Sequence, residues 1–123
     1  MARGCAGLPL RTPETFTAAR TEDYEYALEH IIRKYPHRPI YLVSFSLGAG
    51  INLKWLGLKG REMQGRYSSI KGCVCVSPQY DCHQNTQLFP MLSKGLVINL
   101  IRMARKHKEA LANHSDSQIL FKV

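Results

Sequence analysis

The sequence predicts an α/β fold with a parallel sheet and crossover helices. The expected order of elements is loop, helix, strand, helix, strand, helix. Such alternation is typical of parallel strands joined by helical crossovers. Both expected strands are short apolar runs bounded by turn residues. The 123 residues, of which 45% are hydrophobic, favour a single domain over residues 1–123.

The first half of the chain supplies the loop, a helix and a strand. Residues 1–20 lack periodicity and contain glycines and prolines, which indicates a loop. Thr21 is expected to cap the first helix with its hydroxyl, and Pro36 and Pro39 to end it. Residues 40–43 are rich in β-branched side chains and predict a strand buried on both faces. The apolar stripe of the helix consists of Tyr24, Leu28, Ile31, Ile32 and Tyr35.

The second half continues this alternation. Apolar residues from Ala49 to Leu56 predict a buried helix that ends near Gly57 or Gly60. A polar connection over 59–69 leads to a second strand over 72–76, which Ser77 and Pro78 end. Residues 92–111 have the pattern of an amphipathic helix.

The segment from Ser44 to Gly48 lies between the first expected strand and the helix that follows it. A serine in such a turn is typical of a nucleophile elbow, which exposes the hydroxyl at its tip. Ser46 is therefore the candidate nucleophile, and the Leu47 amide is the candidate oxyanion donor. Small residues are expected two positions before and after Ser46, because the turn brings backbones close; here they are Ser44 and Gly48. The alternative is an ordinary strand-to-helix turn capped by a serine.

Several motifs, in order and spacing, resemble a known family, and they extend to about residue 112. Residues 3–7, 21–23 and 44–48 carry most of the resemblance, with Tyr35-Pro36, residues 55–57, Ser77-Pro78 and Asp81. The chain resembles AB hydrolase family 4 of the α/β-hydrolase-domain proteins. This subfamily contains esterases, acylglycerol lipases and phospholipases, often with an N-terminal membrane anchor. Residues 113–123 do not match and are expected to be a divergent tail.

The resemblance implies a partial α/β-hydrolase fold, from the turn after the fourth strand through the sixth strand and the following helix. It implies that Ser46 is the nucleophile of an enzyme acting on carboxylic esters, with acyl lipids as substrates and no cofactor. The acid and histidine of the family follow its seventh and eighth strands, outside this sequence. The 123 residues alone are therefore expected to be inactive. Without the third strand they are also expected to fold poorly or to need partner segments.

Asp81 and His83 follow the second expected strand and are an alternative acid and base for Ser46, although a solvated turn is favoured. His107 and His114 are expected to be exposed surface residues. No group of histidines, cysteines and acids has ligand spacing, so no metal is expected.

The formal net charge of +8 favours an anionic partner. The basic residues are scattered and no nucleic-acid-binding signature is present, so a nucleic-acid partner is not expected. Residues 102–108 form the one dense basic group, on a helix expected to pack on the domain; peripheral contact with anionic lipid headgroups is the alternative. The cysteines form no C-x-x-C pair and predict a reducing compartment.

No signal peptide or membrane-spanning run is found in the sequence. Membrane association is therefore implied only by the family resemblance. A function of a different class also remains open. The chain could be a truncated, non-catalytic product that binds a partner through exposed sheet edges.

Overall fold

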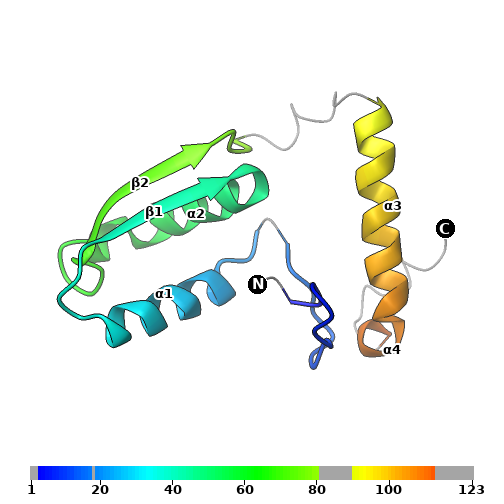
Figure 1. Cartoon of the computed structure of the whole chain (residues 1–123), viewed down its shortest axis with the longest axis horizontal. Helices are drawn as coiled ribbons and strands as arrows, with labels where there is room; N and C mark the ends of the chain where they lie inside the picture. Colours follow the sequence, from blue (N-terminus) through cyan, green and yellow to red (C-terminus); the bar gives the residue numbers. More distant parts are fainter. Residues whose placement is uncertain (1–2, 18, 81–89, 113–123) are drawn as a thin grey trace. The chain divides into compact units, whose positions relative to one another are not determined.

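The computed structural model describes residues 3–17, 19–80 and 90–112 of the chain (Figure 1). The chain divides into two compact units. One unit comprises residues 17–83 and contains the sheet. The other combines residues 1–16 with residues 84–123.

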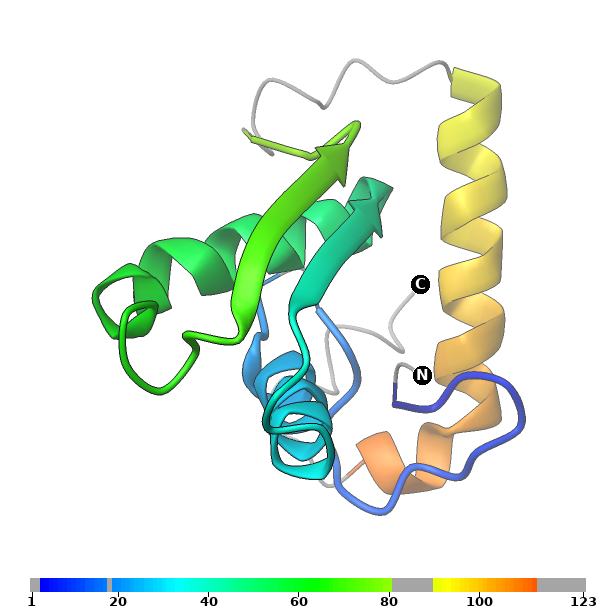
Figure 2. The same ribbon diagram turned by 60° about the vertical axis from the view of Figure 1, so that its left-hand side comes forward.

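The sheet of the first unit has two parallel strands, β1 (Ile40–Phe45) and β2 (Ile70–Val76). Between them the chain forms helix α2 (Ser46–Lys59) and the short 3-10 helix η1 (Gly60–Glu62). Figures 1 and 2 show α2 running along one face of both strands. The predicted alternation of strand, crossover helix and parallel strand is thus confirmed. Strand β1 ends two residues later than predicted, and β2 begins two residues earlier.

Helix α1 (Glu22–Lys34) precedes β1 and matches its predicted position. Acidic residues occupy its first turn and basic residues its last turn, which complements the helix dipole. The predicted cap at Thr21 is wrong, because its side chain makes no capping hydrogen bond. Thr21 has helical rather than extended backbone angles, φ −111° and ψ −9°, whereas a capping residue normally leaves the helical region.

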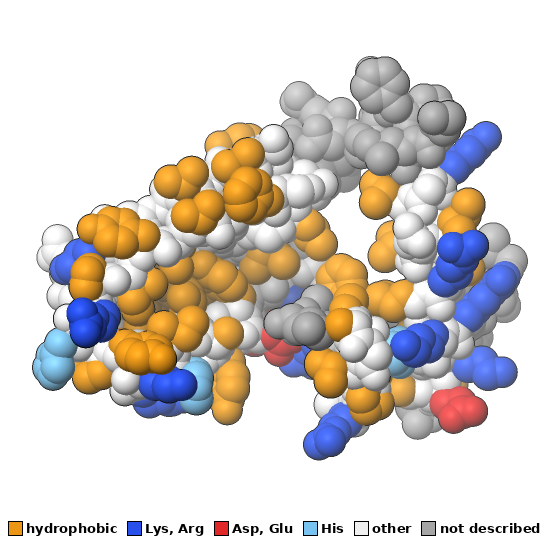
Figure 3. Space-filling model, viewed as in Figure 1, with side chains coloured by type: hydrophobic (Ala, Val, Ile, Leu, Met, Phe, Trp, Pro, Cys, Tyr) orange, Lys and Arg blue, Asp and Glu red, His pale blue; other side chains and the backbone are white. Residues whose placement is uncertain are grey.

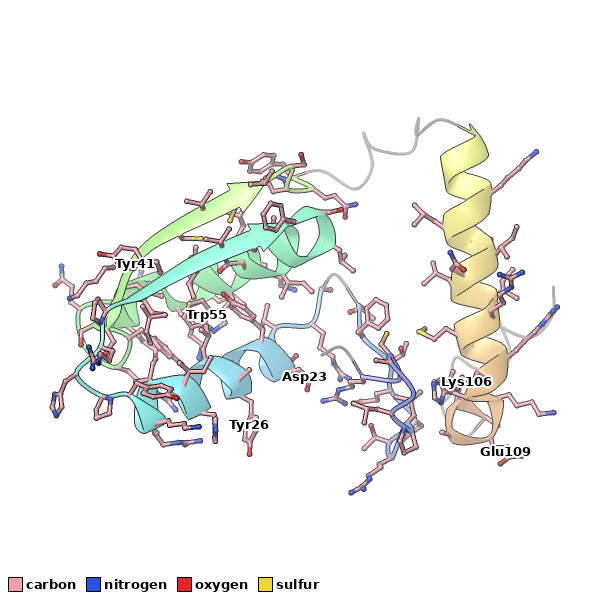
Figure 4. All side chains as sticks on the ribbon, in the orientation of Figure 1. Asp23, Tyr26, Tyr41, Trp55, Lys106 and Glu109 are labelled. Carbon is pink, nitrogen blue, oxygen red and sulfur yellow. The ribbon has the colours of Figure 1, made fainter. Side chains whose placement is uncertain are left out.

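The core of this unit lies between α1, α2 and the strands. Trp55 and Tyr67 are fully buried and pack with Leu28 and Leu42. The Trp55 ring lies edge-on to Tyr67, with centroids 4.9 Å apart, and edge-on to Tyr24 at 5.6 Å. Figure 4 shows Trp55 between α1 and the strands. Aromatic pairs in this geometry add stabilisation beyond the area that they bury.

Tyr67 corrects the expectation of a merely polar connection over 59–69. The Tyr67 hydroxyl donates to Glu25 Oε1 at 2.6 Å and to Glu29 Oε1 at 3.2 Å, both on α1. Lys59 Nζ lies 2.8 Å from the same Glu25 oxygen. The connection therefore returns to α1 and closes one end of the core.

The two faces of the sheet differ, and this corrects the expectation that the strands are buried on both faces. The covered face carries Leu42, Ser44, Cys73 and Cys75, which are buried or half-buried. The open face carries five exposed apolar side chains, Tyr41, Val43, Phe45, Val74 and Val76. Figure 3 shows hydrophobic side chains gathered along the strands. Exposed and buried side chains alternate because, within the described part of residues 17–83, only one face of the sheet is packed against helices.

The second unit contains helices α3 (Pro90–Lys106) and α4 (Lys108–Leu111). The single predicted helix over 92–111 is interrupted at His107. His107 is buried rather than exposed as predicted, and its Nε2 lies 2.8 Å from the Gly4 carbonyl oxygen. Gly4 has a φ of +72°, so its backbone turns in a conformation that suits glycine. His114 lies outside the described residues.

Candidate active site

Strand β1 passes into helix α2 with no intervening residue. Phe45, the last residue of β1, is extended with φ −128° and ψ 144°. Ser46, the first residue of α2, has a φ of +48°. A non-glycine residue in this region costs about 1–3 kcal/mol and persists only where the surrounding structure holds it. Ser46 therefore occupies a sharp and strained turn at the carboxyl end of the strand.

The side chain of Ser46 is exposed, so a reactant can reach its hydroxyl. The described contacts at this junction include no hydrogen bond to the Ser46 side chain. The next residue, Leu47, belongs to the first turn of α2, where backbone N–H groups have no partner within the helix. No acidic residue occupies that turn. A helix start of this kind favours an anion near its amides.

Ser44 lies two residues before Ser46 and points to the covered face of the sheet. Its hydroxyl donates to the Val74 carbonyl oxygen at 3.4 Å and lies 3.4 Å from Cys75 Sγ. It also accepts a hydrogen bond from Asn52 Nδ2 at 2.9 Å. Ser44 is therefore connected to β2 and α2, the two elements packed around the end of β1.

A small residue was expected at Gly48 because the turn would bring another backbone close to it, but no such close approach occurs among the described residues. A Cβ atom at this position would meet no atom within 4 Å in the described part of the chain. At Gly50, by contrast, a Cβ atom would lie 3.8 Å from the Gln79 carbonyl oxygen. The loop after β2 thus passes along the first turns of α2, and Gly50 rather than Gly48 is the glycine closest to it.

The carboxyl ends of the two strands meet at one edge of the sheet, because Phe45 pairs with Val76. Ser77 follows β2 directly and has a φ of +50°. Ligand and catalytic groups of parallel sheets collect at this edge. The chain leads from Ser77 toward Asp81 and His83, which lie outside the described residues.

Asn52 is a buried polar residue beside the candidate site that the sequence interpretation missed. It is fully buried on α2, and its side chain bonds with β1, β2 and α1. A signal existed, because Ala49, Asn52 and Trp55 follow one another at intervals of three residues, and all three are buried. A lone amide within an apolar helical stripe indicates a buried polar group that needs partners.

Burial affects two of the groups that bond with Asn52, Tyr24 and Cys73. Burial, with a smaller effect from Cys73 and Cys75, raises the pKa of Tyr24 to about 12. Burial also raises the pKa of the Cys73 thiol. Neither group is a ready nucleophile at neutral pH, which leaves hydrogen bonding as their contribution to this site.

The described residues contain no cluster of three or more histidine, cysteine or acidic side chains arranged to hold a metal ion. Within the same residues, no helix is both long enough and apolar enough to cross a membrane.

Comparison with known proteins identifies lipases and phospholipases among the relatives. The chain is 31% identical over 122 residues to a monoacylglycerol lipase of Saccharomyces cerevisiae, covering 94% of this chain and 26% of that protein. It is 30% identical over 107 residues to embryogenesis-associated protein EMB8 of Picea glauca, covering 85% of this chain and 23% of that protein. It is 40% identical over 60 residues to human phospholipase ABHD3, covering 49% of this chain and 15% of that protein.

The chain thus spans about a quarter or less of the length of these curated relatives. No family model matches the chain, and no solved structure matches it significantly.

Proposed function

Because this chain belongs to the α/β-hydrolase-domain family, we propose that Ser46 is the nucleophile of a serine hydrolase. The substrates are carboxylic esters of acyl lipids. Two relatives, a monoacylglycerol lipase and a phospholipase, support this substrate class. The segment corresponds to the part of the α/β-hydrolase fold that runs from the turn after its fourth strand to the helix after its sixth.

The observation that carries the proposal is the φ of +48° at Ser46, between β1 and α2. A serine that merely capped a helix would keep an ordinary extended backbone. A nucleophile elbow instead strains the serine so that its hydroxyl projects from the turn. The strained and exposed Ser46 supports the elbow over the simple cap.

The chemistry is acyl transfer. Ser46 Oγ attacks the ester carbonyl carbon and passes its proton to a general base, while the Leu47 amide stabilises the developing oxyanion. The tetrahedral intermediate collapses, the alcohol leaves with a proton, and water then hydrolyses the acyl-enzyme. Among residues 19–80, no side chain that could act as a base is hydrogen-bonded to Ser46. We assign the general base and its acid to the histidine and acid that the family resemblance implies outside this sequence, with Asp81 and His83 as the disfavoured alternative.

Apolar side chains next to Ser46 are consistent with an acyl substrate. Phe45 directly precedes Ser46, and Val76 pairs with Phe45 across the sheet. Both apolar side chains are exposed. An acyl chain near the nucleophile could contact this apolar surface without displacing a charged group.

The decisive experiment is covalent labelling of the intact protein with a fluorophosphonate, followed by mass spectrometry of the labelled peptide. Attack by Ser46 Oγ forms an oxygen–phosphorus bond and releases fluoride. We expect Ser46→Ala to abolish labelling and to lower hydrolysis of a p-nitrophenyl acyl ester by at least roughly a thousandfold.

Ser77→Ala is the matched control, because Ser77 is also a serine with positive φ at a strand end. We expect Ser77→Ala to retain labelling within about twofold of the unsubstituted protein. Labelling that persists in folded Ser46→Ala would contradict the proposal. A folded protein that is never labelled would favour the non-catalytic alternative. Unchanged labelling in Asp81→Ala and His83→Ala would exclude these two residues as the acid and base.

A further inference from the structure

Asn52 lies at the centre of a buried hydrogen-bond network in the first unit. Its Nδ2 donates to Ser44 Oγ on β1 at 2.9 Å and to Cys73 Sγ on β2 at 2.9 Å. Its Oδ1 accepts from the Tyr24 hydroxyl of α1 at 2.8 Å. One fully buried amide thus joins the four principal elements of this unit, and both of its donor hydrogens and its acceptor have partners.

The network explains why serine occupies position 44. The corresponding position of a nucleophile elbow usually carries glycine. A glycine here would deprive a buried Asn52 donor of its acceptor, and buried donors without partners are strongly disfavoured. Asn52 and Ser44 therefore form a matched pair, which joins α2 to the end of β1.

This pair bridges the strained turn. Ser44 lies two residues before Ser46, and Asn52 lies six residues after it. A positive φ at a non-glycine residue persists only where the structure on both sides constrains the chain. The Ser44–Asn52 hydrogen bond constrains both sides, and the bond from Ser44 to the Val74 carbonyl oxygen connects this constraint to β2.

We infer that Asn52 is a positioning residue, which acts through Ser44 to hold the Ser46 turn. The inference rests on the proposed function only for its effect on the reaction rate. Its structural part, the maintenance of the backbone at Ser46, stands by itself.

The first experiment measures the reaction in the intact protein. We expect Ser44→Ala and Asn52→Leu each to lower the fluorophosphonate labelling rate, normalised to folded protein, by roughly 10- to 100-fold. For p-nitrophenyl ester hydrolysis the loss should appear in kcat, with KM within about twofold, because substrate contacts are retained. The double variant should lose no more than the worse single variant, since each substitution breaks the same hydrogen bond.

Tyr67→Phe is the matched control. It also removes a buried hydroxyl that bonds with α1, at 2.6 Å from Glu25, but among the described residues Tyr67 has no hydrogen bond to Ser44 or Asn52. We expect its labelling rate to stay within about twofold of the unsubstituted protein. Equal losses in Tyr67→Phe and Ser44→Ala, or additive losses in the double variant, would overturn the positioning role.

The second experiment does not depend on catalysis. The three-bond HN–Hα coupling and the Cα and Cβ chemical shifts of Ser46 report its φ by nuclear magnetic resonance. We expect the positive φ to remain in Tyr67→Phe and to be lost or averaged in the milder variant Ser44→Ala. If the fluorophosphonate labels neither the unsubstituted protein nor the variants, the proposed function fails, and the magnetic resonance measurement of the Ser46 φ angle alone decides the inference. An unchanged φ in folded Ser44→Ala would refute it.

Discussion

The covered and open faces of the β1–β2 sheet both carry apolar side chains, but they differ in how these side chains are packed. On the covered side, Ile40, Leu42 and Ile70 pack in or against the core, beside the small or polar side chains of Ser44, Cys73 and Cys75. The open face consists of large apolar side chains, with Tyr41 69% exposed and Phe45 63% exposed. Large apolar side chains thus occur on both faces, but within the described part of residues 17–83 only the covered face is packed against helices.

The difference shows that helix placement, rather than hydrophobicity alone, decides which face of a short strand is packed. A crossover helix returns along one side of the sheet, and α2 therefore covers the face that contains Ser44. The polar groups on that face make the hydrogen bonds around the Ser46 turn. The apolar groups on the other face contribute little to packing within this unit, and they expose apolar surface to water.

The largest effect is expected from truncating the core beneath the covered face. Trp55→Ala removes a fully buried ring that contacts Tyr24 and Tyr67. We expect the free energy of unfolding to fall by about 3–5 kcal/mol, because the lost contacts leave a cavity. Urea unfolding followed by far-ultraviolet circular dichroism measures this change. Tyr26→Ala is the control, since Tyr26 is 69% exposed and points away from the core in Figure 4; a similar loss there would contradict the prediction.

The next effect concerns acid stability at the edge of the same core. Hydrogen bonds from Lys59, and then from Tyr67, hold the pKa of Glu25 below its ordinary value of 4.5. The folded state therefore favours the carboxylate, and its contribution to stability is present above the unfolded-state pKa. That contribution is lost as the pH falls below 4.5 and through the lower folded-state pKa.

Glu25→Gln tests this acid dependence. We expect a lower free energy of unfolding at neutral pH and a shallower decline below pH 4.5 than in the unsubstituted protein. Glu22→Gln is the control, because Glu22 makes a long 3.8 Å ion pair with Arg20 and is largely exposed. If the free energy of unfolding of Glu25→Gln falls with pH as steeply as that of Glu22→Gln, Glu25 is not the cause of the acid sensitivity.

The smallest effect on stability is expected on the open face. The double variant Tyr41→Thr/Val43→Thr keeps strand propensity and replaces two exposed apolar side chains. We expect the free energy of unfolding to change by less than about 1 kcal/mol, while aggregation measured by static light scattering decreases. Leu42→Thr, on the covered face of the same strand, should instead destabilise the fold by more than about 2 kcal/mol. Equal destabilisation by both variants would remove the distinction between the faces.

Much of the fold could be predicted from local patterns. The acidic and basic ends of α1, the apolar run before Ser44, and the turn residues Ser77 and Pro78 indicated their elements, because near neighbours determine helix and strand preference. The candidate nucleophile was recognisable because a serine between a strand and a helix suits the elbow. The assignment of Ser46 as a catalytic residue remains a prediction for the labelling experiment.

The missed features depend on residues distant in sequence. Tyr67 was expected in a polar connection, yet its ring fills the core because α1 supplies Glu25 and Glu29 as partners for its hydroxyl. His107 was expected on the surface, yet Gly4 supplies a carbonyl oxygen for its ring more than one hundred residues away in sequence. A buried polar side chain becomes predictable only once its partners have been placed.

The sequence by itself therefore determined the order of elements, the parallel α/β class and the position of Ser46 between a strand and a helix. These features follow from periodicity and turn chemistry within a few residues. The tertiary structure alone decided which face of the sheet is covered, that Asn52 joins β1, β2 and α1, and that Ser46 has a positive φ. These features arise from contacts between elements, where packing and the need of buried polar groups for partners outweigh local preference.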